Sequence, residues 1–267
     1  DPEKPGHPGD RDRKLSRRVP GGHPRALSTL FFTEMWERFT FYGMRALLVL
    51  FLVDAVESGG YGLDDKTATA IYGLYTAAVF MAALPGGWIA DRLIGAQRAV
   101  MIGGTLMTLG TLMLTIPGPK QLFFGGLVVI ILGVGLLKPN VSTLVADLYP
   151  EGGGRRDAGF TIFYMGINLG AFIGPLIAGW LAQRYGWRIG FLAAAIGLPF
   201  GLLQFWLSRG LFNGAGAQPN RNDGGAGLAT DWRRLWIALA VFAAVAALLF
   251  SGAVHLDPAR LAQGAAY

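Results

Sequence analysis

Residues 27–53 are long enough to cross a bilayer as one helix, yet this stretch carries charged side chains. They are Glu34, Glu37, Arg38 and Arg45. At about 100° per residue all four fall on one face of a helix together with Tyr42, and apolar side chains cover the opposite face. An ionisable residue at the bilayer centre costs about 2.5–3.5 kcal/mol, so such residues normally face a bundle interior or a water-filled cavity. The stretch therefore predicts a membrane helix that lines a transport pathway.

The rest of the chain repeats apolar segments of similar length. Of its 267 residues, 52% are hydrophobic and 15% are charged, and the mean hydropathy is +0.42. These values are typical of an integral membrane protein. The further spans are expected at residues 67–93, 99–116, 121–149, 158–182 and 187–208, with an additional one at 235–254. We expect an all-α integral membrane fold with a six-helix bundle and one connector helix.

Polar stretches divide the chain into segments. Residues 1–24 are rich in Pro, Gly and basic side chains and predict a disordered tail, whereas the Gly- and Asn-rich residues 210–231 predict a linker. The six-helix bundle then occupies residues 25–209, the connector helix 232–256, and the start of a following segment 257–267. Most arginines between spans lie on the side of the tail and the linker, so the N-terminus is predicted to be cytoplasmic.

Composition also excludes several classes of protein. The net charge of +6 comes from the tail and the connections between spans, where membrane topology accounts for it, so we expect no nucleic-acid partner. The chain has no cysteine, and its three histidines do not have the spacing of a metal site. No nucleophile has a positioned histidine base, so neither an enzyme nor a metal or organic cofactor is expected.

The first span can hold a proton switch. Glu34 and Arg38 are four residues apart and Glu37 adjoins Arg38, so the arginine can neutralise either carboxylate and leave the other available for a proton. The alternative is a static ion pair that joins helices. Two acids, two arginines and Tyr42 on one face favour the functional interpretation.

Lys138 is a second cation at membrane depth. Pro139 follows it and is predicted to interrupt the fourth span, because proline leaves a backbone carbonyl unpaired and kinks a helix. The first and fourth spans are thus the polar or broken ones, a pattern expected of two three-helix repeats with a substrate cavity between them. Arg38, Arg45 and Lys138 together suit a carboxylate ligand.

The fifth span combines small and polar side chains. Its glycines, Gly166, Gly170 and Gly174, predict a ridge for close helix packing. Tyr164 and Asn168 lie four residues apart on one face; Asn168 has either a binding role or a hydrogen bond to a neighbouring helix. In the second span the aromatic residues are assigned to the core; they are Tyr72, Tyr75, Phe80 and Trp88.

Four motifs resemble those of one transporter family. Residues 34–43 read EMWERFTFYG and resemble the first-helix motif of the proton-dependent oligopeptide transporter family. Residues 87–95, GWIADRLIG, resemble the cytoplasmic motif of the wider major facilitator superfamily. Residues 138–140, KPN, and 163–170, FYMGINLG, resemble the fourth- and fifth-helix signatures of the family.

The resemblance implies the N-terminal half of a major facilitator fold and proton-coupled import of di- and tripeptides, driven by the proton gradient across a bacterial inner membrane. Glu34, Glu37, Arg38 and Lys138 are then the proton-coupling residues. The peptide would be bound by the cations and by polar side chains beside them; the set is Arg38, Tyr42, Arg45, Lys138, Tyr164 and Asn168. Family members usually carry tyrosine at the positions of Phe41 and Phe80, so the pocket here lacks two hydroxyl groups.

The family fold needs about twelve core helices, so a missing C-terminal half is expected as a partner, alongside peptide, protons and membrane lipid. Two other interpretations remain open. One is a facilitator-type carrier for nitrate or another anion, because a cationic pocket suits any anion. The other is a non-transporting membrane receptor or assembly subunit whose charges recruit partners.

Overall fold

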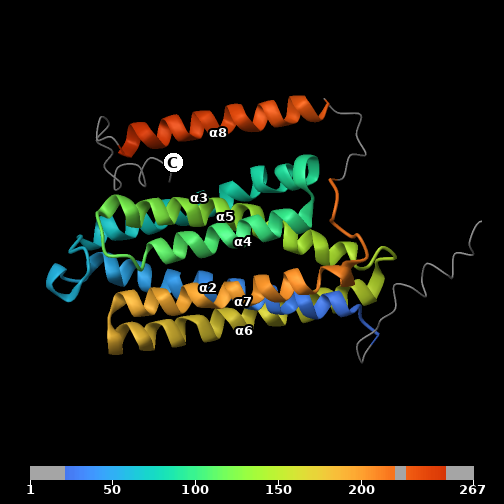
Figure 1. Cartoon of the computed structure of the whole chain (residues 1–267). Helices are drawn as coiled ribbons and strands as arrows, with labels where there is room; N and C mark the ends of the chain where they lie inside the picture. The colour runs from blue at the N-terminus through green and yellow to red at the C-terminus, as the bar shows by residue number, and fades with distance from the viewer. Residues whose placement is uncertain (1–21, 220–226, 251–267) are drawn as a thin grey trace, which may run out of the picture.

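A computed structural model describes residues 22–219 and 227–250 of the chain (Figure 1). Its long helices are α2 (Arg25–Val53), α3 (Asp65–Ile89), α4 (Ala96–Met113), α5 (Lys120–Asp147), α6 (Gly153–Tyr185), α7 (Trp187–Leu207) and α8 (Leu228–Phe250). Short helical turns cover Val56–Ser58, Ala90–Ile94 and Arg209–Phe212. No strand occurs within these two ranges, so the all-α prediction is confirmed for them. The predicted tail, residues 1–24, lies mostly outside the described residues, as do residues 220–226 of the predicted linker and the whole segment 257–267.

The helices α2 to α7 form one bundle, and α8 runs along its edge in Figure 1 and contacts it at the short turn Ala90–Ile94. Helix α2 packs mainly on α6 and α7, and helix α5 packs mainly on α4 and α3. The first helix of each sequence half therefore packs against the second and third helices of the other half. This exchange is the arrangement expected of two three-helix repeats.

The glycine ridge of α6 allows its close approach to α2. A Cβ atom at Gly166 would lie 2.7 Å from the carbonyl oxygen of Phe31, and one at Gly170 would lie 2.1 Å from that of Met35. Any larger side chain at these positions would have to push the helices apart. The predicted packing role of the ridge is thus confirmed. The ridge holds α6 against the backbone of α2 at Phe31 and Met35.

Pro139 does not interrupt α5, and that prediction is wrong. The helix continues from Lys120 to Asp147, although Pro139 has no backbone N–H to donate. The side-chain amide of Asn140 donates to the carbonyl oxygen of Leu136 at 2.6 Å and to that of Gly86 in α3 at 3.3 Å. The carbonyl of Gly135, which proline leaves without a donor, lies against Gly86, where a Cβ would come within 2.0 Å of it.

Helix ends differ from the predicted spans by a few residues. Helix α4 begins at Ala96, three residues before the expected start, α6 begins at Gly153 instead of 158, and α8 begins at Leu228 instead of 235. Helix α3 begins after Asp64, whose carboxylate accepts a hydrogen bond of 2.9 Å from the backbone N–H of Thr67. That cap explains why α3 starts in an otherwise polar connection.

Four helical segments are long and apolar enough to cross a membrane: Asp65–Ile94, Lys120–Asp147, Gly153–Tyr185 and Trp187–Leu207. Helix α2 is long enough but every 18-residue window of it holds more than two charged residues. The chain is therefore a multi-pass membrane protein in which one helix carries its charges inside the bundle.

Candidate functional site

The charged face of α2 is buried in the bundle. Glu34, Glu37 and Arg38 are 3%, 0% and 3% exposed. The Nε atom of Arg38 lies 3.2 Å from a carboxylate oxygen of Glu34 and also contacts a carboxylate oxygen of Glu37. One guanidinium thus serves two carboxylates, as the spacing of the sequence predicts.

This cluster is only partly satisfied by hydrogen bonds. The second carboxylate oxygen of each glutamate is buried without a hydrogen-bond partner among the described residues, and so is one terminal nitrogen of Arg38. A buried polar atom without a partner costs about 1–3 kcal/mol. A ligand that bonds to the free nitrogen of Arg38, or a proton on one of the glutamates, would remove part of this cost. The cluster is therefore suited to exchange one ion-pair partner for another.

Both arginines of α2 lie against aromatic rings. The guanidinium carbon of Arg38 is 5.2 Å from the ring centroid of Phe41 and 5.8 Å from that of Tyr42. The guanidinium carbon of Arg45 is 5.9 Å from the centroid of Tyr42 and 5.0 Å from that of Tyr72, and its Nε atom donates to the Tyr72 hydroxyl. Aromatic faces stabilise these cations without neutralising their charge.

Lys138 of α5 lies on the same side of the bundle and is half-buried. Its Nζ atom lies 4.8 Å from the ring centroid of Phe80 in α3. No carboxylate of the described residues lies within salt-bridge distance of Lys138, although Glu34 and Glu37 contribute to its electrostatic environment. The cation is therefore held by a ring and remains available to an anion.

The two polar residues predicted on α6 are not brought into contact with these cations. Tyr164 is 54% exposed and packs its ring against Phe160 and Phe163, and Asn168 is exposed. Neither forms a hydrogen bond with a described residue of α2 or α5. Both residues lie on the exposed part of α6 beside the glycine ridge.

The assignment of the α3 aromatics to the core is partly wrong. Tyr75 is buried as predicted, whereas Phe80 is 62% exposed and covers Lys138. Tyr72 packs at the edge of the core, but its hydroxyl accepts a hydrogen bond from Arg45. The apolar pattern of α3 did not indicate these contacts, because they depend on which cations α2 and α5 place opposite the rings; only the family resemblance pointed to a pocket position for Phe80.

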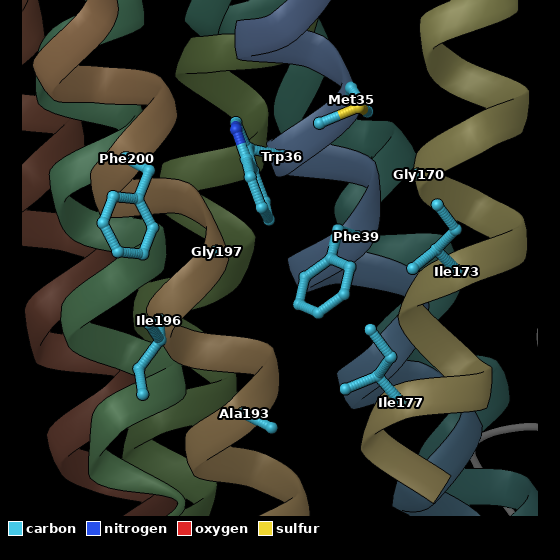
Figure 2. A pocket seen from close by; sticks show the side chains of 10 residues that line it. All are labelled: Met35, Trp36, Phe39, Gly170, Ile173, Ile177, Ala193, Ile196, Gly197 and Phe200. Carbon is cyan, nitrogen blue, oxygen red and sulfur yellow. The ribbon is translucent and has the colours of Figure 1, made fainter.

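A separate pocket of about 260 Å³ opens on the other side of α2, between α6 and α7. Figure 2 shows Trp36 and Phe39 of α2 between the isoleucines of α6 and the side chains of α7. The pocket is lined by Met35, Trp36, Phe39, Gly170, Ile173, Ile177, Ala193, Ile196, Gly197 and Phe200. It has no charged lining residue, so it does not suit a polar or charged substrate.

The described part of the chain is thus a bundle of membrane helices with buried acids and ring-supported cations on one helix face. The model of the POT family matches residues 97–245. The chain is 42% identical to the peptide transporter YePEPT of Yersinia enterocolitica over 93% of its own length and 51% of that protein. It is 47% identical to a di-/tripeptide transporter of Lactococcus lactis over 70% of its own length and 38% of that protein.

Solved structures agree with these sequence comparisons. A crystal structure of a mutant of the peptide transporter POT in complex with alafosfalin matches 91% of this chain and 50% of that chain, with 43% identity and a TM-score of 0.82. The chain therefore belongs to the POT family and has the major facilitator fold of its N-terminal portion. It spans about half the length of the relatives it matches.

Proposed function

We propose that the complete protein is a proton-coupled symporter that imports di- and tripeptides by alternating access, and that this chain is its N-terminal half. The observation that carries the proposal is Lys138: a half-buried cation beside two buried acids, held by the ring of Phe80 and free of any carboxylate among the described residues. A cation kept charged and unneutralised in a membrane bundle is suited to bind an anionic group.

The peptide carboxylate is the group that this wall of the cavity binds. Arg45 and Lys138 are less buried than Arg38 and carry no ion pair in the described part of the chain, so they bind the carboxylate first. Arg38 binds the carboxylate later, once one of its ion pairs with a glutamate has broken. Tyr42 supplies a hydroxyl next to both arginines, and Tyr164 and Asn168 contribute from α6 when the peptide and the second half close the cavity.

Protons are carried by Glu34 and Glu37. Protonation of one of these acids neutralises it and weakens its ion pair with Arg38. The guanidinium is then free to bind the peptide carboxylate. Release of the proton on the other side of the membrane restores the ion pair and expels the carboxylate. Coupling follows because the arginine cannot fully satisfy an ionised glutamate and a peptide carboxylate at the same time. The driving force is the proton gradient, and the cycle needs neither a cofactor nor an enzymatic step.

The same proposal places the chain in a bacterial inner membrane with a cytoplasmic N-terminus. Helices α2 to α7 are then six spans of residues 25–209, residues 210–227 a cytoplasmic linker, and α8 a connector helix to the second half. Arg92, between α3 and α4, and Arg155 and Arg156, in the first turn of α6, support this orientation. The names of the relatives in the comparison support the substrate class, since two of them are a peptide transporter and a di-/tripeptide transporter.

Uptake by the full-length protein in liposomes tests the proposal. With an inwardly directed proton gradient, labelled dialanine should accumulate, and a proton ionophore should abolish the accumulation. Lys138→Ala should remove uptake, whereas Lys120→Ala, which removes a cation outside the cavity, should not. Accumulation of nitrate without any uptake of dialanine would overturn the substrate assignment.

A further inference from the structure

Helix α2 has two different faces at the level of its buried acids. Glu37 and Arg38 form an ion pair on the charged face. Trp36 and Phe39 lie on the opposite side, where they line the apolar pocket of about 260 Å³ between α6 and α7 (Figure 2). The pocket thus lies behind the same turn of α2 that carries the ion pair, and the proposed peptide site makes no use of it.

The pocket lies near the middle of three long helices. Its lining comes from residues 35–39 of α2, 170–177 of α6 and 193–200 of α7. Helices α6 and α7 are both long and apolar enough to cross a membrane. Since a helix rises about 1.5 Å per residue, each lining stretch lies within about 12 Å of the midpoint of its helix. The pocket is therefore at the depth of the hydrocarbon core, which is about 30 Å thick.

The pocket opens toward the outside of the bundle. Phe39 on α2 is 7% exposed, whereas the side chains at the mouth are well exposed: Ile177 is 42%, Ile196 47% and Phe200 57% exposed. Further large apolar side chains of α6 and α7 are exposed as well; they are Phe172, Leu176, Trp180 and Leu203. An exposed apolar surface at this depth of a membrane protein faces lipid tails, which are as apolar as leucine. The mouth of the pocket therefore meets acyl chains.

The lining and the position of the pocket disfavour other occupants. A polar ligand would find no charged lining residue, and α8 contacts the bundle at Ala90–Ile94 instead. The second half of the proposed transporter meets the charged face, on the opposite side of α2. An apolar cavity of about 150 Å³ is already large enough to bind benzene, so this pocket has room for a stretch of acyl chain. A chain inside it gains dispersion contacts that the lining would otherwise lack.

We propose that the pocket is a binding site for one acyl chain of a bilayer phospholipid, which enters between α6 and α7 and ends against Trp36 and Phe39. The bound chain supports the turn of α2 whose other face holds Glu37 and Arg38. The proposal goes beyond the proposed transport activity. Its tests measure lipid contact without transport, so their failure would leave the proposed function untouched.

Quenching of tryptophan fluorescence by brominated lipid tests the proposal. The full-length protein, in variants that keep a single tryptophan, is reconstituted into vesicles of a phosphatidylcholine brominated near the middle of an acyl chain, or of its unbrominated parent. Trp36 should lose at least about half as much emission as Trp180, because a chain in the pocket contacts one side of the Trp36 indole and lipid surrounds the exposed Trp180. Unchanged emission at Trp36 beside a loss at Trp180 would show that the pocket is closed to lipid and would overturn the proposal.

Filling the pocket distinguishes a chain bound inside it from lipid that passes over its mouth. With Trp36 as the only tryptophan, the pair Ile173→Phe and Ala193→Phe adds bulk from both walls and should reduce the loss of emission at least about twofold (Figure 2). The control pair Ala171→Phe and Gly179→Phe adds bulk to α6 outside the lining and should leave the loss unchanged. Equal losses in the filled and control variants would contradict the proposal. If the filled variant does not fold, the preceding comparison decides alone, because it leaves the lining intact.

Discussion

The ammonium group of Lys138 lies 4.8 Å from the centroid of the Phe80 ring, so a cation of α5 rests on an exposed aromatic side chain of α3. A cation–π contact at a partly exposed site is worth about 0.5–1 kcal/mol, much less than an ion pair with a substrate carboxylate in a dry cavity. The ring therefore orients the lysine without competing seriously for its charge. The family resemblance predicts a tyrosine here, and Phe80 offers the ring face without the hydroxyl.

Two substitutions at Phe80 should distinguish the effect of the ring face on substrate affinity from the effect of the missing hydroxyl. Phe80→Leu removes the face and should raise the KM for dialanine about two- to fivefold, in line with a loss of about 0.5–1 kcal/mol. Phe80→Tyr keeps the face and should leave the KM unchanged or lower it. Initial rates of uptake over a range of dialanine concentrations check both. An equal rise in KM for the two variants would contradict the role given to the ring.

Neutralising Glu37 should uncouple transport from protons. In Glu37→Gln the side chain can no longer gain or lose a proton, so proton-driven uptake of dialanine should fall about tenfold or more. Counterflow should persist, because exchange needs no net movement of protons. Glu151→Gln is the control, since Glu151 is an exposed acid paired with Arg155 at 3.4 Å outside the bundle. Loss of counterflow together with driven uptake would assign Glu37 to binding or folding instead of coupling.

The contact between α6 and α2 should not tolerate a methyl group at Gly170. A Cβ there would lie 2.1 Å from the carbonyl oxygen of Met35, so Gly170→Ala should destabilise the protein by about 1–3 kcal/mol and lower its apparent Tm. Gly179→Ala lies on the same helix with no atom within 4 Å of the added group and should leave the Tm unchanged or raise it slightly. Thermal unfolding in detergent compares the two variants.

The start of α3 should depend on pH through Asp64. Its hydrogen bonds with Thr67 hold the pKa of this exposed carboxyl below its usual value. A group with a lowered folded-state pKa stabilises the fold at pH values above its unfolded-state pKa, and this contribution disappears as the pH falls through the lower folded value. Amide hydrogen exchange at residues 65–68 should therefore speed up on acidification, relative to Asp64→Asn, whose cap oxygen does not titrate.

Local spacing in the sequence was enough to predict part of this site. The ion pair of Glu34 with Arg38 and the contact of Glu37 with Arg38 follow from their positions on one helix, and the structure confirms both. The glycine ridge of α6 was also predictable, because three glycines spaced four residues apart form a smooth helix face that allows close packing of a second helix.

Contacts between helices could not be predicted in this way. From the residues of α3 alone Phe80 was assigned to the core, because nothing in α3 shows that α5 places Lys138 against its ring; the family resemblance instead placed Phe80 in the pocket. Pro139 was predicted to break α5, but Asn140 supplies a side-chain donor and Gly86 of α3 supplies room for the freed carbonyl. Both errors concern contacts between α3 and α5, which form only when the two helices pack together.

The central claim is that Arg45 and Lys138, and then Arg38, receive the carboxylate of the peptide. Competition of unlabelled dialanine and dialanine amide against labelled dialanine, measured with the full-length protein, tests it most directly because the two competitors differ in that carboxylate. A lost charge-assisted contact of about 1.5–3 kcal/mol predicts that the amide competes at least about tenfold more weakly. Equal competition by the two compounds would contradict the account.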